Sequence, residues 1–162
     1  MKKAVLSQAR TSGFTIVELV VVIALIGILS AVALPRFIDV GRDATLATME
    51  GLVKALQTST NLTHATAMIE GRHTLATDTL TVEGQAVAMV YGYPSGTVNG
   101  IPAMIKTMPQ GWQQRASSYS GAWVFWHGSI EQDAGAARCY VRYRQATSVS
   151  QPPVIDFQSS GC

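Results

Sequence analysis

The feature that most constrains this chain is an apolar run from Phe14 to Leu34 that carries one acid, Glu18, near its start. An α-helix rises 1.5 Å per residue, so about 20 apolar residues are enough to cross the hydrocarbon core of a bilayer. The run therefore predicts a membrane-spanning helix. Its acid is the feature that any functional interpretation has to explain.

Three interpretations compete for this run. The cations Lys2, Lys3 and Arg10 all precede it, which places the N-terminus in the cytoplasm and the remainder of the chain outside. An ordinary secretory signal would be cut near Ala33 and release a soluble secreted domain, but its apolar core would exceed the about 7–15 residues of signal peptides. A plain anchor has no use for an intramembrane carboxylate. The third interpretation must account for that acid.

A carboxylate in a membrane helix costs on the order of 2–3 kcal/mol, so a charge partner is expected. The sequence has no Lys, Arg or His between Phe14 and Pro35, so a cation has to come from a chain terminus or another chain. Cleavage between Gly13 and Phe14 would create an α-amine at the positive end of the helix, close to Glu18. That amine would supply the missing cation.

The residues around this bond resemble the N-terminal signature of type IV pilins. The shared features are a short cationic leader, a glycine before the cut, and Phe14, Thr15 and Glu18 in register within residues 13–23. The resemblance implies that a prepilin peptidase cuts after Gly13 and methylates the amine of Phe14. It also implies that Glu18 pairs with the amine of a neighbouring subunit during filament assembly.

Gly27 and Pro35 occupy the positions where the long helix of that family is interrupted. Pro35 lacks an amide donor and clashes with the preceding turn, while a glycine costs about 1 kcal/mol of helix stability. The segment between them is therefore the weakest part of the helix. We expect it to bend or unwind, with unwinding belonging to the assembled state and a tolerated kink describing the free subunit.

After Pro35 an amphipathic pattern continues the helix to about Ile69, and Gly71 offers a stop. Apolar residues recur at three- and four-residue steps, at Leu46, Met49, Leu52, Val53 and Leu56. The opposite side carries the polar residues Asp43, Glu50, Lys54, Gln57 and Asn61. A stripe of this kind has to be covered, and the rest of the chain predicts a sheet to cover it.

Residues 80–91 predict a hairpin with a turn at Glu83 and Gly84, and aromatic or β-branched runs predict strands at 122–127, 138–144 and 154–157. A short helix is expected over 101–108. The predicted fold is α+β, the type IV pilin fold, with one long helix on an antiparallel sheet. Its expected parts are a cleaved leader (1–13), an assembly helix (14–36), an amphipathic continuation (37–70) and a globular β-rich region (71–162).

Cys139 and Cys162 lie in the part predicted to be outside the cytoplasm, where disulfides persist. We expect them to pair, which would remove about 3 kcal/mol of unfolded-state entropy and fix the C-terminus. Two independent thiols are the alternative. A bridge at this place resembles the disulfide-bounded region of pilins and departs from the main type II secretion pseudopilin.

Composition and motifs argue against several other functions. Charged residues make up only 14%, and once the leader is removed acids outnumber cations, so no basic surface favours nucleic acid. Nucleophile, phosphate-loop and dinucleotide motifs are absent, so we expect no enzyme and no cofactor. The histidines His64, His73 and His127 are not spaced as metal ligands.

The aromatic residues have two interpretations. They could form a stacking surface for sugars, which would suit an adhesin with a surface carbohydrate receptor, but packing in the core or against another subunit is the stronger interpretation. The residues concerned are Trp112, Trp123, Trp126, Tyr91 and Tyr93.

Short motifs in the globular half resemble mannose-sensitive haemagglutinin (MSHA) pilins. They are residues 91–94 (Tyr-Gly-Tyr-Pro), 139–141 (Cys-Tyr-Val) and 160–162 (Ser-Gly-Cys). The resemblance implies a major pilus subunit that first sits in the inner membrane with its C-terminus in the periplasm. The assembly machinery would then build it into extracellular homo-oligomeric filaments for adhesion and biofilm formation. A minor pilin or type II secretion pseudopilin is the alternative.

Overall fold

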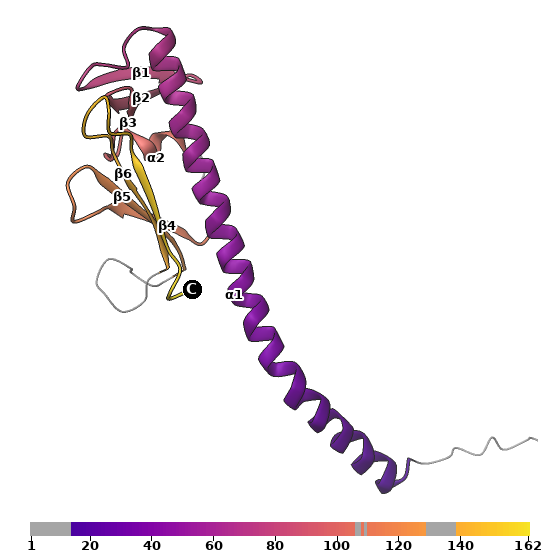
Figure 1. The fold of residues 1–162 in the computed structure, drawn as a ribbon. Coiled ribbons are helices and arrows are strands. Elements are labelled where there is room, and N and C mark those ends of the chain that lie inside the picture. The colour runs from indigo at the N-terminus through magenta and orange to yellow at the C-terminus, as the bar shows by residue number, and fades with distance from the viewer. Residues whose placement is uncertain (1–13, 106–107, 109, 129–138) are drawn as a thin grey trace, which may run out of the picture. The chain divides into compact units, whose positions relative to one another are not determined.

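A computed structural model describes residues 14–105, 108, 110–128 and 139–162, with the side chains of 32–39 left out. The chain divides between Gly41 and Arg42 into two compact units, and each is described by itself. The first holds the N-terminal part of a long helix. The second holds the rest of that helix and two antiparallel sheets, which lie alongside it in Figure 1. The α+β arrangement of a helix on antiparallel strands is confirmed.

Helix α1 runs from Ile16 to Ile69 over 54 residues, close to the predicted bounds. Its backbone stays helical through Gly27 and Pro35. At its end the amide of Arg72 donates to the carbonyl of Ala67, and Gly71 has a positive φ of 68°. This pairing with a left-handed residue is the Schellman motif, so Gly71 is the stop that the sequence predicts.

The first sheet contains three strands in the order β1-β2-β3. Strands β1 (Asp78–Val82) and β2 (Gln85–Val90) form the predicted hairpin, and positive φ angles at Glu83 and Gly84 make its two-residue turn. Strand β3 (Tyr93–Pro94) was not predicted as a strand. It follows a second such turn at residues 91–92, so the chain folds back and pairs with β2. The sequence had predicted only that the hairpin ends at these residues.

The second sheet contains four strands in the order β4-β5-β6-β7, all antiparallel to their neighbours. Strands β5 (Ala122–His127), β6 (Tyr140–Arg144) and β7 (Val154–Gln158) match the sequence prediction closely. Edge strand β4 (Trp112–Ala116) was missed because its polar residues show no alternation. Helix α2 is a single turn, Ile101–Met104, because Ile105 leaves the helical conformation.

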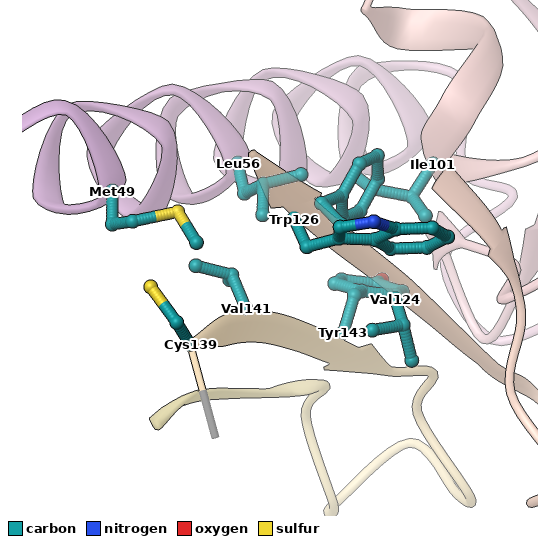
Figure 2. Packing of buried hydrophobic residues seen from close by; sticks show 9 residues of the cluster. Met49, Leu56, Ile101, Val124, Trp126, Cys139, Val141 and Tyr143 are labelled. Carbon is teal, nitrogen blue, oxygen red and sulfur yellow. The ribbon is translucent and has the colours of Figure 1, made fainter. Parts of the chain in front are cut away.

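The core between α1 and the four-stranded sheet uses the apolar stripe that the sequence predicts. Met49 and Leu56 are fully buried and belong to one cluster with Phe125, Val141 and Tyr143. Figure 2 shows Met49 and Leu56 pointing from the helix toward the strand that carries Val141. The middle turns of α1 are therefore covered by this sheet.

The last turns of α1 pack on the three-stranded sheet. Ala67 is fully buried in a second cluster with Leu80, Val82, Val87 and Met89. One helix thus covers two sheets, where the sequence predicted one.

Side-chain hydrogen bonds join the two sheets. The buried hydroxyl of Tyr143 in β6 donates to the carbonyl of Pro94 in β3 at 2.6 Å. The amide of Gly96 donates to Oε1 of Gln145 at 2.9 Å, a second link between the segments after β3 and β6. Burial raises the pKa of Tyr143, so this hydroxyl keeps its proton.

Cys139 and Cys162 form a disulfide with a Cα–Cα distance of 4.8 Å. The predicted pairing is confirmed. Because Cys139 directly precedes β6 and Cys162 follows β7, the bridge closes the last two strands of the sheet at one end.

Candidate functional site

The first part of α1 is an apolar surface that the described residues leave uncovered. Every large hydrophobic side chain from Phe14 to Leu29 is exposed, from 44% at Val22 to 81% at Ile16. These side chains lie all around the helix, so a single covering partner on one side would not bury them. Among the residues whose side chains are described, no helix combines the length and the hydropathy needed to cross a membrane.

Thr15 and Glu18 form a polar group at the N-terminus of this apolar helix. The amide and the hydroxyl of Thr15 both donate to Oε2 of Glu18, at 3.0 and 2.9 Å. The amide of Glu18 donates back to the hydroxyl oxygen of Thr15 at 3.3 Å. Thr15 directly precedes the first helical residue, and Glu18 is the third helical residue. This reciprocal arrangement is a capping box, which satisfies backbone donors that a helix start leaves open.

Sequence reasoning named Glu18 but missed the role of Thr15. The signal was present, because Thr-x-x-Glu before an apolar run is the pattern of a capping box. The structure therefore adds a local hydrogen-bond partner for the acid. Residues 14–31 still offer no positively charged partner, because Glu18 is the only ionisable residue within this range.

The structure describes some of the other residues predicted for processing and assembly, but not all of them. Gly13 and the leader lie outside the described residues, while the side chain of Phe14 is 78% exposed. A Cβ built on Gly27 would meet no atom within 4 Å, so nothing in the described structure requires glycine there. Pro35 lies inside α1, and its side chain is not described. Interruption of the helix at these positions stays a prediction.

The histidines lie in two separate aromatic contacts. His64 stacks on Tyr93 with ring centroids 4.0 Å apart, and His73 meets His64 edge-on at 6.3 Å. His127 contacts Trp112 at 5.7 Å. Position 92, beside this first group, requires a glycine, because a Cβ there would lie only 2.8 Å from Cα of His73. Within the described part of the chain, no three potential metal ligands come together.

The tryptophans pack as the stronger of the two sequence interpretations predicts. Trp126 is 8% exposed and belongs to the main core cluster, shown in Figure 2, while Trp112 and Trp123 pack against that cluster. The indole N–H of Trp123 donates to Oε1 of Gln114 at 3.1 Å. The aromatic side chains therefore contribute mainly to the interior of the second unit.

Charged side chains stabilise two edges of the globular part. Arg72, just after α1, bonds to Asp78 at the start of β1, and this hydrogen bond, with that of the Thr79 amide, lowers the pKa of Asp78. On β6, Arg142 and Arg144 both reach Asp156 of β7, at 3.3 and 3.1 Å. These pairs attach the helix end to the first sheet and connect the last two strands of the second.

Comparison with known proteins points to the same N-terminal residues as the geometry. Residues 8–34 match the family described as the prokaryotic N-terminal methylation motif. The chain is 42% identical over 50 residues to the type IV narrow pilus major component PilA5 of Thermus thermophilus, covering 31% of this chain and 43% of that protein. It is 41% identical over 66 residues to a fimbrial protein of Moraxella nonliquefaciens, covering 40% of this chain and 43% of that protein.

The chain thus spans less than half the length of the curated relatives it matches. No solved structure shows a significant match. The N-terminal methylation motif and the similarity to pilus components are the two findings on which a functional conclusion can rest.

Proposed function

We propose that this protein is the major structural subunit of a bacterial type IV pilus, and that its activity is assembly. The observation that carries the proposal is the exposed apolar helix beginning at Phe14, with Glu18 in its first turn, inside the segment that matches the methylation motif. The relatives named as a pilus component and a fimbrial protein support it. A helix that is apolar on all sides suits a bundle in which each copy is surrounded by others.

The proposed sequence of events begins with processing. A prepilin peptidase removes residues 1–13 at Gly13 and methylates the amine of Phe14. The precursor waits in the inner membrane as a single-pass protein with its C-terminus in the periplasm. The assembly machinery then extracts it, and residues 14–36 exchange contact with lipid for contact with neighbouring copies, while residues 37–162 form the outer part of an extracellular filament.

Glu18 has a specific role in this sequence. Its carboxylate pairs with the Phe14 amine of a second copy, which would satisfy both charges when lipid is replaced by protein. Gly27 and Pro35 mark the part of the helix that would unwind on assembly. The motifs at residues 91–94 and 139–141 favour an MSHA-like pilus that attaches cells to surfaces, binds a carbohydrate receptor and supports biofilm formation.

The first test is the intact mass of the mature protein. We expect a chain that begins with methylated Phe14. A chain that begins at Leu34 would instead identify a secreted soluble domain and would refute the pilin proposal. Mass spectrometry of sheared surface fibres gives the second test, because a major subunit should dominate the sample. Trace amounts would favour a minor pilin or a type II secretion pseudopilin.

The third test addresses Glu18 directly. Glu18→Ala should leave leader removal intact and lower the yield of sheared filaments at least about tenfold, since a buried unpaired amine costs more than ~1.4 kcal/mol. Glu50→Ala is the matched control, because Glu50 lies on the same helix, is exposed and has no ion-pair partner among the described residues. Wild-type filament yield in Glu18→Ala would refute the pairing role.

A further inference from the structure

We infer that Thr15 is a positioning residue for Glu18: it holds one carboxylate oxygen inside its own chain and leaves the other for the amine of a second copy. The inference rests on the proposed function as a pilus subunit. It concerns the free subunit, in which no second copy yet offers its amine to the acid.

The hydrogen bonds from Thr15 involve only one of the two carboxylate oxygens of Glu18. Oε2 of Glu18 accepts from both the amide and the hydroxyl of Thr15, at 3.0 and 2.9 Å. Oε1 has no hydrogen-bond partner among the described residues. The cap and an incoming ammonium group therefore do not compete for the same oxygen.

The hydroxyl of Thr15 uses both of its hydrogen-bonding functions. It donates to the carboxylate and accepts from the amide of Glu18 at 3.3 Å, so it closes a ring with the residue it positions. A backbone N–H without a partner is strongly unfavourable in lipid, where no water replaces the lost bond, and the box gives partners to the amides of Thr15 and Glu18 and to one carboxylate oxygen. The capping box thus offsets part of the cost of the acid in a membrane helix before any second copy arrives.

Positioning also helps the assembly step. A glutamate side chain that is already fixed in one rotamer loses less conformational entropy when it forms an ion pair. Thr15 would thereby strengthen the contact between two copies without touching the second copy itself.

The experiment compares three variants of the full chain, expressed with its processing and assembly proteins. Thr15→Val keeps the shape and loses the hydroxyl, Thr15→Ser keeps the hydroxyl, and Glu18→Gln keeps a side chain that can still cap but removes the charge. Two quantities are measured: hydrogen exchange of the Glu18 amide in detergent-solubilised chains, and sheared filament yield normalised to processed subunit.

In Thr15→Val we expect amide exchange to rise about fivefold, the factor that corresponds to the ~1 kcal/mol of a lost helix cap, and filament yield to fall by at least that factor. Thr15→Ser should restore both quantities to near wild type. Wild-type exchange or wild-type yield in Thr15→Val overturns the inference, as does a Thr15→Ser variant as defective as Thr15→Val.

Glu18→Gln separates this inference from the proposed function. It should keep near wild-type exchange, because glutamine can occupy the same place in a capping box, and it should lose filaments because the charge is gone. Normal filaments in Glu18→Gln would refute the charge pairing while leaving the capping role standing. Raised exchange in Glu18→Gln would show that the cap needs the charged acid. That result would overturn the inference that one carboxylate oxygen serves the cap and the other serves the amine.

Discussion

Replacing Tyr143 by phenylalanine tests whether a buried hydrogen bond holds the two sheets together. The side chain of Tyr143 is fully buried, and its hydroxyl donates to the carbonyl of Pro94 in the other sheet at 2.6 Å. Phenylalanine keeps the ring and its packing, so no large cavity forms. The substitution therefore removes the hydroxyl and little else.

The magnitude follows from the burial of this contact. A hydrogen bond contributes about 0.5–1.5 kcal/mol net, and a buried acceptor deprived of its donor adds a cost of about 1–3 kcal/mol. We expect the free energy of unfolding of Tyr143→Phe to fall by about 2 kcal/mol. The surface buried on folding hardly changes, so the urea midpoint should fall while the slope of the transition stays the same.

The assay is urea unfolding of the full chain in detergent, followed by tryptophan fluorescence, since Trp126 lies in the same core cluster. Tyr119→Phe is the matched control, because Tyr119 is 61% exposed. It should unfold at the wild-type midpoint. If Tyr143→Phe unfolds at the same urea concentration as Tyr119→Phe, the bond between the sheets does not contribute as argued.

The pH dependence gives an independent check on the same side chain. Burial raises the pKa of Tyr143, so the folded state binds this proton more tightly than the unfolded chain does. Its stabilising effect is complete below the unfolded pKa of about 10 and is lost as the pH rises above it. Above about pH 10 the wild type should therefore lose stability faster than Tyr143→Phe, and parallel curves would contradict the assignment.

Three further predictions concern the rest of the second unit. Replacing Cys139 and Cys162 together by serine should cost about 3 kcal/mol of unfolding free energy, measured in urea, because the closed loop is lost. Leu56→Ala should cost about 2–5 kcal/mol in the same measurement, since a fully buried leucine leaves a cavity. Asp78→Asn should lower the thermal midpoint at pH 7, and by less as the pH falls below 3.8, because the lowered pKa of Asp78 gives a stabilisation that is lost as the pH falls through it.

Each of these has an outcome that would contradict it. A cysteine-free variant as stable as the oxidised wild type would show that the bridge adds nothing to the folded state. A cost below about 1 kcal/mol for Leu56→Ala would place this residue outside a tightly packed core. An equal deficit of Asp78→Asn at pH 3 and pH 7 would mean that packing, and not the bond to Arg72, sets the effect.

The parts of the fold that follow local rules could be predicted from the sequence. The stop at Gly71 and the turn at residues 83–84 depend on backbone conformations that glycine adopts readily, and the structure has both. The stripe containing Met49 and Leu56 predicted the buried side of α1, because helical spacing fixes which residues share a face. The strand faces of β6 follow from alternation in the same way, with Val141 buried.

The division into two sheets could not be predicted, because it depends on contacts between distant residues. Tyr143 and Pro94 are 49 positions apart, and no local pattern selects one as the partner of the other. Strand β4 exists because β5 offers it hydrogen bonds, whereas its own residues, Trp-Gln-Gln-Arg-Ala, lack an apolar alternation.

The candidate site, too, could be predicted only in part from the sequence. The acid at position 18 was evident from its apolar surroundings, whereas the contribution of Thr15 required the geometry of the first helical turn.

The sharing of one helix by two sheets has a mechanical consequence. A tensile force that enters the second unit through α1 reaches the four-stranded sheet through Met49 and Leu56, and the three-stranded sheet through Ala67. Neither sheet can be pulled off the helix without loading the other, because the Tyr143–Pro94 bond connects them. Separating α1 from both sheets would therefore have to break two hydrophobic contacts and this buried hydrogen bond.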